Sequence, residues 1–143
     1  MNGVCAFKQA PRFHIHKMTV RYFTLEEANE VLTELEPLMA QLLERRAKTV
    51  RMSRQLQHLL GEPHVDFGGS VPTKLAQDFV IIESLLSQIK AYGCVVKNLE
   101  AGLIDFLAKI NGRDVYLCWR YGEDQIAYYH ELHTGFQGRR PLD

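Results

Sequence analysis

Cysteine is scarce in this sequence, and none of it forms a recognisable metal or redox motif. The three cysteines, Cys5, Cys94 and Cys118, are odd in number and irregularly spaced, and no CxxC pair is present. A disulfide framework, a paired-cysteine zinc site and a thioredoxin-like motif are therefore excluded. This pattern is typical of a reducing compartment, and we expect a cytoplasmic protein.

Long apolar runs are also missing. No segment approaches the ~18 consecutive apolar residues of a membrane-spanning helix, and the first seventeen residues lack the apolar run of a signal peptide. The formal net charge is zero, with 17 basic and 17 acidic residues, so the chain as a whole has no preference for a polyanionic partner. We therefore expect no membrane insertion, and any contact with nucleic acid would have to be local.

The chain length indicates one domain. With 143 residues and 46% hydrophobic content, the chain can bury one substantial core but not two ordinary ones. Residues 1–17 show no hydrophobic period, so we expect a flexible N-terminal tail or a segment upstream of the native start. Residues 18–143 are expected to form the domain.

A capping box marks the start of a long helix. Thr24 is followed three residues later by Glu27, and in this motif each side chain accepts a hydrogen bond from the other residue's free backbone N–H. Helical spacing then continues to about Leu60. Pro37 lies inside this segment, where its ring removes one backbone hydrogen bond, so we expect a kink or a restart near Glu36.

A second helix is expected after the Gly- and Pro-rich connection 61–71. Pro72 suits a first helical turn, and Gly93 suits a stop. Its apolar stripe is predicted to consist of Leu75, Phe79, Ile82, Leu86 and Ile89. The first helix has a stripe with the same spacing, formed by Ala28, Leu32, Leu35, Met39 and Leu42. Matching stripes predict that the two helices pack antiparallel.

The remaining sequence changes to short segments rich in aromatic and β-branched residues. Strands are predicted at 103–110, 115–120 and 126–132, with a further strand near 94–97. Asn111-Gly112 is a strong signal for a two-residue hairpin turn. The fold class is therefore α+β: a long antiparallel two-helix hairpin followed by a small antiparallel sheet of three to four strands.

The turns fix which side chains share a face. A two-residue turn at 111–112 places Asp105 opposite Cys118, and a five-residue loop at YGEDQ places Tyr116 opposite His130. Because side chains alternate along a strand, one face becomes apolar and packs on the helices. The opposite face carries the polar set Asp105, Tyr116, Cys118, Arg120, Tyr128 and His130.

This polar face is the candidate functional site. A carboxylate and an imidazole, Asp105 and His130, with Cys118 beside them and Glu100 and Glu123 nearby, suit iron, manganese or zinc, or acid–base chemistry. Alternatively, the face is solvated and Asp105 forms a diagonal ion pair with Arg120. Cys118 is then either a small buried apolar residue or a nucleophile activated by His130. The sequence leaves open whether the protein is an enzyme.

The long helix has an uneven charge distribution. Five glutamates lie between positions 26 and 36, whereas the second half carries the basic residues Arg45, Arg46, Lys48, Arg51 and Arg54. The basic half could be a solvated face or could contact an acidic partner or nucleic acid. A homodimer through antiparallel long helices would pair both halves, and it is the interpretation that explains more of the pattern.

Four motifs resemble a known family. FTLEEANEVL at the helix start, GCVVKNLEAGLIDF, LCWRYGE and YYHELHTGFQGRRPLD are similar to the bacterial domain-of-unknown-function family numbered twenty-two-oh-three. The resemblance covers the chain from Met18 onward and implies a shared domain and a shared polar site, without a mechanism. The chain departs from the family pattern at Asn98, where an aspartate is usual, and at Tyr129, where tryptophan is frequent. The motifs include Lys97, Glu100, Gly102, Asp105, Cys118, Trp119, Glu123 and His130.

Overall fold

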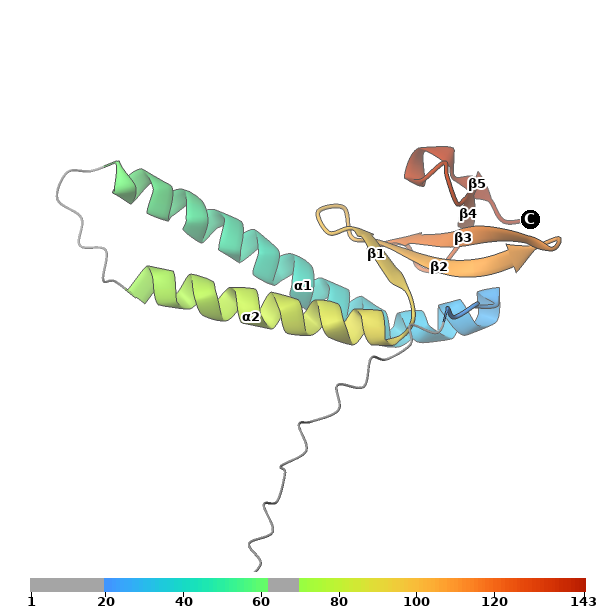
Figure 1. Ribbon diagram of the computed structural model, residues 1–143, viewed down its shortest axis with the longest axis horizontal. Coiled ribbons are helices and arrows are strands. Elements are labelled where there is room, and N and C mark those ends of the chain that lie inside the picture. The colour runs from blue at the N-terminus through green and yellow to red at the C-terminus, as the bar shows by residue number, and fades with distance from the viewer. Residues whose placement is uncertain (1–19, 62–69) are drawn as a thin grey trace, which may run out of the picture.

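The computed structural model describes residues 20–61 and 70–143. Two helices, α1 (Leu25–Leu60) and α2 (Ser70–Ala91), precede a five-stranded sheet and one short 3-10 helix, η1 (Phe136–Gly138). The α+β architecture is confirmed, with the helices on one side of the sheet and η1 on the other (Figure 1). The predicted tail 1–17 and most of the predicted helix connection lie outside the described residues. No helix within the described residues is long and apolar enough to cross a membrane.

The first helix begins at the predicted capping box. The Glu27 backbone N–H donates to Thr24 Oγ1 at 3.1 Å, and the Thr24 N–H donates to Glu27 Oε2 at 3.0 Å. The helix continues through Pro37 to Leu60 without a restart. Its ribbon does change direction between the N-terminal turns and the longer remainder (Figure 1), as expected for a helix containing an interior proline.

The seam between the helices differs from the prediction in α2. The residues of α2 that face α1 are Leu75, Asp78, Ile82, Leu85 and Ile89. Phe79 is instead 55% exposed, so the predicted stripe was wrong at this position, whereas Leu86 is half-buried and packs against the core. Both residue sets fit helical spacing. In the observed set the buried carboxylate of Asp78 accepts a hydrogen bond from Arg45 on α1 at 2.8 Å, which lowers the cost of burying its charge.

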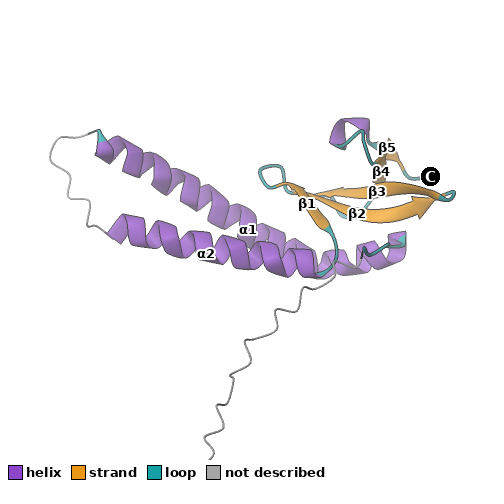
Figure 2. Cartoon of the chain, in the orientation of Figure 1, coloured by secondary structure: helices purple, strands orange, loops and turns teal. Residues whose placement is uncertain are grey.

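The sheet is antiparallel throughout and its strands follow chain order. The strands are β1 (Val95–Asn98), β2 (Leu103–Ile110), β3 (Arg113–Arg120), β4 (Tyr128–Glu131) and β5 (Arg140–Pro141), shown in Figure 2. The prediction of three to four strands was one short. The missed strand is two residues long and contains a proline, so it has neither the length nor the alternation that predicts a strand.

The predicted register is confirmed. Asn111 and Gly112 both have positive φ, 51° and 76°, and the turn pairs Ile110 with Arg113. Asp105 consequently lies opposite Cys118, and Tyr116 lies opposite His130.

The core lies between the sheet and α1. The buried apolar side chains of β2 and β3 on the helix side are Ile104, Phe106, Ala108, Val115, Leu117 and Trp119. The Phe23 ring, just before α1, meets the Phe106 ring edge-on, with 5.1 Å between centroids. Burying these side chains supplies the main driving force for docking the sheet onto the helices. The opposite face of the sheet is therefore left to carry the polar residues.

Candidate metal centre

Three polar side chains from three adjacent strands meet on the face of the sheet away from the helices. Asp105 comes from β2, Cys118 from β3 and His130 from β4, and their candidate ligand atoms all lie within 4.8 Å of one another. Each residue is at most 2% exposed. At these three positions the solvated-face alternative was wrong, and the described residues contain no ion pair between Asp105 and Arg120.

The His130 imidazole is held at both nitrogens. Nδ1 lies 2.8 Å from the Glu131 backbone carbonyl oxygen, and Nε2 lies 3.0 Å from Asp105 Oδ2. A carbonyl oxygen only accepts hydrogen bonds, so we assign the Nδ1 proton to the bond with Glu131. Nε2 then faces the carboxyl group of Asp105, and His130 has no free nitrogen with which to deprotonate Cys118.

Asp105 is buried with one oxygen unused. Its Oδ2 contacts His130, whereas Oδ1 has no hydrogen-bond partner. Burial raises the pKa of the carboxyl group, although the nearby His130, Cys118 and Lys97 partly oppose this effect. Two other described aspartates also have one buried oxygen without a partner, a costly arrangement. Only at Asp105 do a thiol and an imidazole lie within 4.8 Å, so a shared ligand would be stabilising here.

Cys118 is not an activated thiol in the metal-free protein. Burial, reinforced by the negative charge of Asp105, raises its pKa to about 12. A reactive cysteine needs a lowered pKa, because the thiolate is the nucleophile. The arrangement therefore argues against a Cys–His nucleophile, although a bound cation would still stabilise the thiolate.

The C-terminal segment covers one side of this group. Arg139 donates from Nη2 to both carboxylate oxygens of Glu123, each at 2.8 Å, and to the Cys118 carbonyl oxygen at 3.3 Å. Its guanidinium also lies over the rings of Tyr128 and Phe136, 4.2 and 4.7 Å from their centroids. These contacts attach η1 and β5 to the sheet beside the buried group.

Glu123 lies outside the group of three and has its own partners. It binds Arg139 and accepts the Arg120 backbone N–H at 2.9 Å. Burial opposes ionisation of Glu123, but these hydrogen bonds outweigh it and lower the pKa. Arg139 was missed by the sequence analysis, since 132–141 has no hydrophobic period and the only signal was its position in the last motif.

Glu100 is also separate from the group. It lies in the turn between β1 and β2, its side chain is 80% exposed, and its closest basic partner is Arg46 at 3.9 Å. Of the five predicted ligands, the structure therefore brings together Asp105, Cys118 and His130 and leaves Glu100 and Glu123 outside.

The basic residues of α1 do not form one free surface. Asp78 pairs with Arg45 at 2.8 Å and lies 3.9 Å from Lys48, and Arg46 pairs with Glu100. Arg51 and Arg54 form no ion pair within residues 20–61 and 70–143. The cationic group available to an acidic partner is thus smaller than the sequence indicated.

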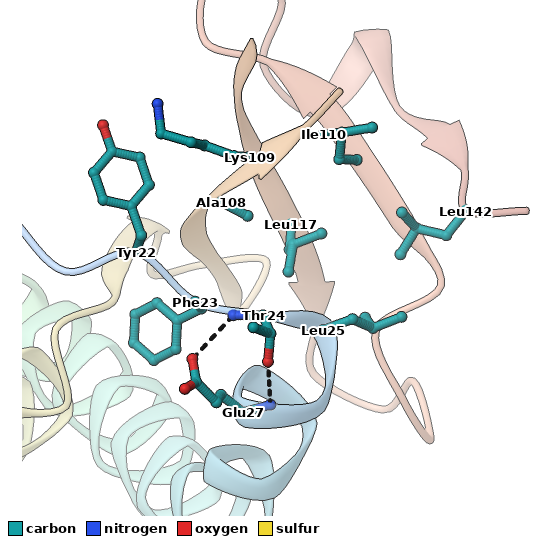
Figure 3. Close-up of a pocket in the computed structure, with 10 residues that line it drawn as sticks. All are labelled: Tyr22, Phe23, Thr24, Leu25, Glu27, Ala108, Lys109, Ile110, Leu117 and Leu142. Atoms are coloured by element: carbon teal, nitrogen blue, oxygen red, sulfur yellow. Dashed lines mark hydrogen bonds between the residues drawn. The ribbon is translucent and has the colours of Figure 1, made fainter. Parts of the chain in front are cut away.

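A separate cavity lies elsewhere on the molecule. It measures about 670 Å³ and is lined mainly by apolar side chains, including Phe23, Leu25, Ala108, Leu117 and Leu142 (Figure 3). Ala108 and Leu117 belong to the helix-facing side of the sheet. The cavity is therefore on the opposite face from Asp105, Cys118 and His130, and it has no polar cluster that suggests chemistry.

Comparison with known proteins identifies a family without an assigned activity. No curated protein and no solved structure matches the chain. One family model, described as "Uncharacterized conserved protein (DUF2203)", matches residues 21–142 and so spans both helices, the sheet and the C-terminal segment. The chain belongs to this family.

Proposed function

We propose that this protein binds one divalent metal ion through Asp105, Cys118 and His130. The observation that supports this most directly is the burial of three ligand-type atoms within 4.8 Å of one another, next to a carboxylate oxygen without a partner. Three protein ligands and one open position are typical of zinc sites that accept a further ligand.

The donor set favours zinc or iron(II) over manganese. A thiolate is a soft ligand and an imidazole is intermediate, whereas manganese prefers sites made of oxygen. The hydrogen bond from His130 Nδ1 to Glu131 O is the outer contact that metal-bound histidines usually make, and it leaves Nε2 to bind the ion. The carboxylate of Asp105 would supply the third donor, and its Oδ2 already lies 3.0 Å from His130 Nε2.

Elemental analysis of protein purified without a histidine tag tests this proposal. We expect near-stoichiometric metal in the parent protein, or uptake of added zinc or iron(II), and loss in Asp105→Asn, Cys118→Ser and His130→Ala. Cys94→Ser is the matched control, because Cys94 is also a buried cysteine but lies outside the group. A parent protein that neither contains nor binds zinc, iron(II) or manganese would overturn the proposal.

Thermal unfolding gives an independent readout. An ion that binds only the folded state should stabilise it by about 4 kcal/mol at a free concentration 1,000 times Kd. The stabilisation should be absent in the three ligand variants and retained in Cys94→Ser.

A second candidate function is self-association through the helices. Phe79 and Val80 on α2 are 55% and 66% exposed, which is unusual for large apolar side chains on one helix, and a second copy would cover them. Sedimentation experiments that compare the oligomeric state of the parent protein with that of Phe79→Ser and of the charge reversal Arg51→Glu/Arg54→Glu test this. A parent protein that stays monomeric at high micromolar concentration would reject it. A nucleic-acid role gains no support, since Arg45, Arg46 and Lys48 pair within the chain.

A further inference from the structure

The two sides of the buried group are unlike each other. On the β4 side, Arg139 and η1 cover it, and Arg139 is neutralised by Glu123. On the β1 side, Val95, which lies directly opposite Asp105, is 42% exposed, and Lys97 is exposed. The three side chains of the group are themselves at most 2% exposed, so a ligand from solvent would have to enter over β1 and β2, the less covered side.

Lys97 is placed at this open side by an irregularity in the sheet. Val96 pairs with Ile104 and Asn98 pairs with Leu103, so Lys97 is the extra residue of a bulge. Bulges re-aim a side chain and are frequent beside functional sites. The Lys97 ammonium lies 4.7 Å over the Tyr116 ring, and this ring lies 5.6 Å from the His130 ring. Tyr116 thus connects the lysine to a proposed metal ligand.

The charges leave Lys97 without a partner. A divalent ion bound to the thiolate of Cys118 and the carboxylate of Asp105 is electrically neutral, and Arg139 with Glu123 is a neutral pair. Lys97 forms no ion pair within residues 20–61 and 70–143. The metal-loaded site therefore has one uncompensated positive charge on its open side.

We propose that the metal-loaded site binds a small oxyanion, a carboxylate or a phosphate group, between the ion and Lys97. This inference rests on the proposed metal site. One oxygen of the anion occupies the open position on the metal, and another accepts a charge-assisted hydrogen bond from Lys97. The Tyr116 ring holds the Lys97 ammonium next to His130, from where it can reach an anion bound at the metal.

Cobalt(II) substitution tests the inference without an assay of activity. Cobalt absorbs visible light, and an anion that enters its coordination shell changes the spectrum. We expect acetate and inorganic phosphate, titrated separately, to change the absorption bands of the cobalt-loaded protein. The anion that binds more tightly identifies the ligand class. Lys97→Met, which keeps the stem and removes the charge, should weaken oxyanion binding about tenfold or more, with cobalt uptake unchanged.

Lys109→Met is the matched control. Lys109 also lies over a tyrosine ring, that of Tyr22 at 5.0 Å, but it is paired with Asp114 at 3.0 Å, so its loss should leave oxyanion binding unchanged. Two results would overturn the inference and leave metal binding intact. One is a cobalt-loaded protein whose spectrum does not change with either anion, and the other is a Lys97→Met variant that binds the anions as tightly as the parent. Failure to take up cobalt, seen as absent bands, overturns both.

Discussion

His130 Nε2 lies 3.0 Å from Asp105 Oδ2, while Nδ1 of the same ring faces the Glu131 carbonyl oxygen at 2.8 Å. With the Nδ1 proton given to the carbonyl, the imidazole and the carboxylate share one further proton, because two lone pairs at hydrogen-bond distance would repel each other. Cys118 keeps its own proton, since its pKa is raised to about 12. A bound cation would take the place of both protons.

Metal loading should therefore release about two protons per ion near pH 7. The affinity for zinc should rise as pH increases, because the competing protons become less available, with a slope of about two decades per pH unit. The number of released protons is measured by titrating weakly buffered protein with zinc in the presence of a pH indicator. Cys118→Ser should lower it to about one, and a count near zero in the parent would contradict the assignment.

The thiols provide a test of burial in the metal-free protein. Burial raises the pKa of Cys94 to about 11, against the opposing effects of a backbone hydrogen bond and Arg21, and Cys118 is raised further. In a Cys5→Ser background at pH 8, both should react with a disulfide reagent at least ~100-fold more slowly than in urea, because so little thiolate is present. Rapid labelling of native Cys118, located by mass spectrometry, would show that the thiol is not enclosed.

Arg139 should control how fast the ion exchanges. Removing its contacts with Glu123 and Cys118 lowers the free energy needed to lift η1 and β5 from the sheet. We expect Arg139→Ala to release zinc to a coloured chelator about tenfold faster or more, with a smaller change in equilibrium affinity.

Arg140→Ala is the neighbouring control, because Arg140 is exposed and no ion pair of its side chain is found among the described residues. Equal release rates in the two variants would mean that the C-terminal segment does not limit access. Circular dichroism of both variants establishes that the fold is retained.

Gly102 should be less replaceable than Gly112, although both have positive φ. Gly112, at φ 76° in the β2–β3 turn, has open space where a Cβ would lie, so Gly112→Ala should cost only the left-handed strain, about 1 kcal/mol. At Gly102, φ 65°, a Cβ would lie 2.8 Å from Tyr121 Cβ and 3.3 Å from Leu43 Cδ1. Gly102→Ala should therefore cost about 2–4 kcal/mol in urea unfolding, and equal costs would contradict the close packing.

Local signals were sufficient where a turn or a cap determines the structure. Thr24 and Glu27 start α1 as predicted, and counting outward from Asn111-Gly112 placed Asp105 opposite Cys118. The grouping with His130 followed from the length of the next loop. These features depend on a few neighbouring residues, and sequence displays them directly.

The sequence was insufficient where the outcome depends on distant partners. On α2 the sequence predicted Phe79 in the buried stripe, whereas the structure buries Asp78, whose partner Arg45 lies 33 residues away on α1. The burial of Asp105, Cys118 and His130 within the polar face could not be foreseen either. It depends in part on Arg139, which attaches a segment without any hydrophobic period.

The pairing register of β2 and β3 determines both the apolar core and the grouping of the three candidate ligands. A shift of the β2–β3 pairing by a single residue would exchange the two faces of a strand, turning Asp105 toward the helices and Phe106 toward His130. Only the correctly paired sheet assembles all three donors. An ion that needs all three donors would therefore stabilise only chains with the correct strand register. Chains with shifted strands would gain no stability from it.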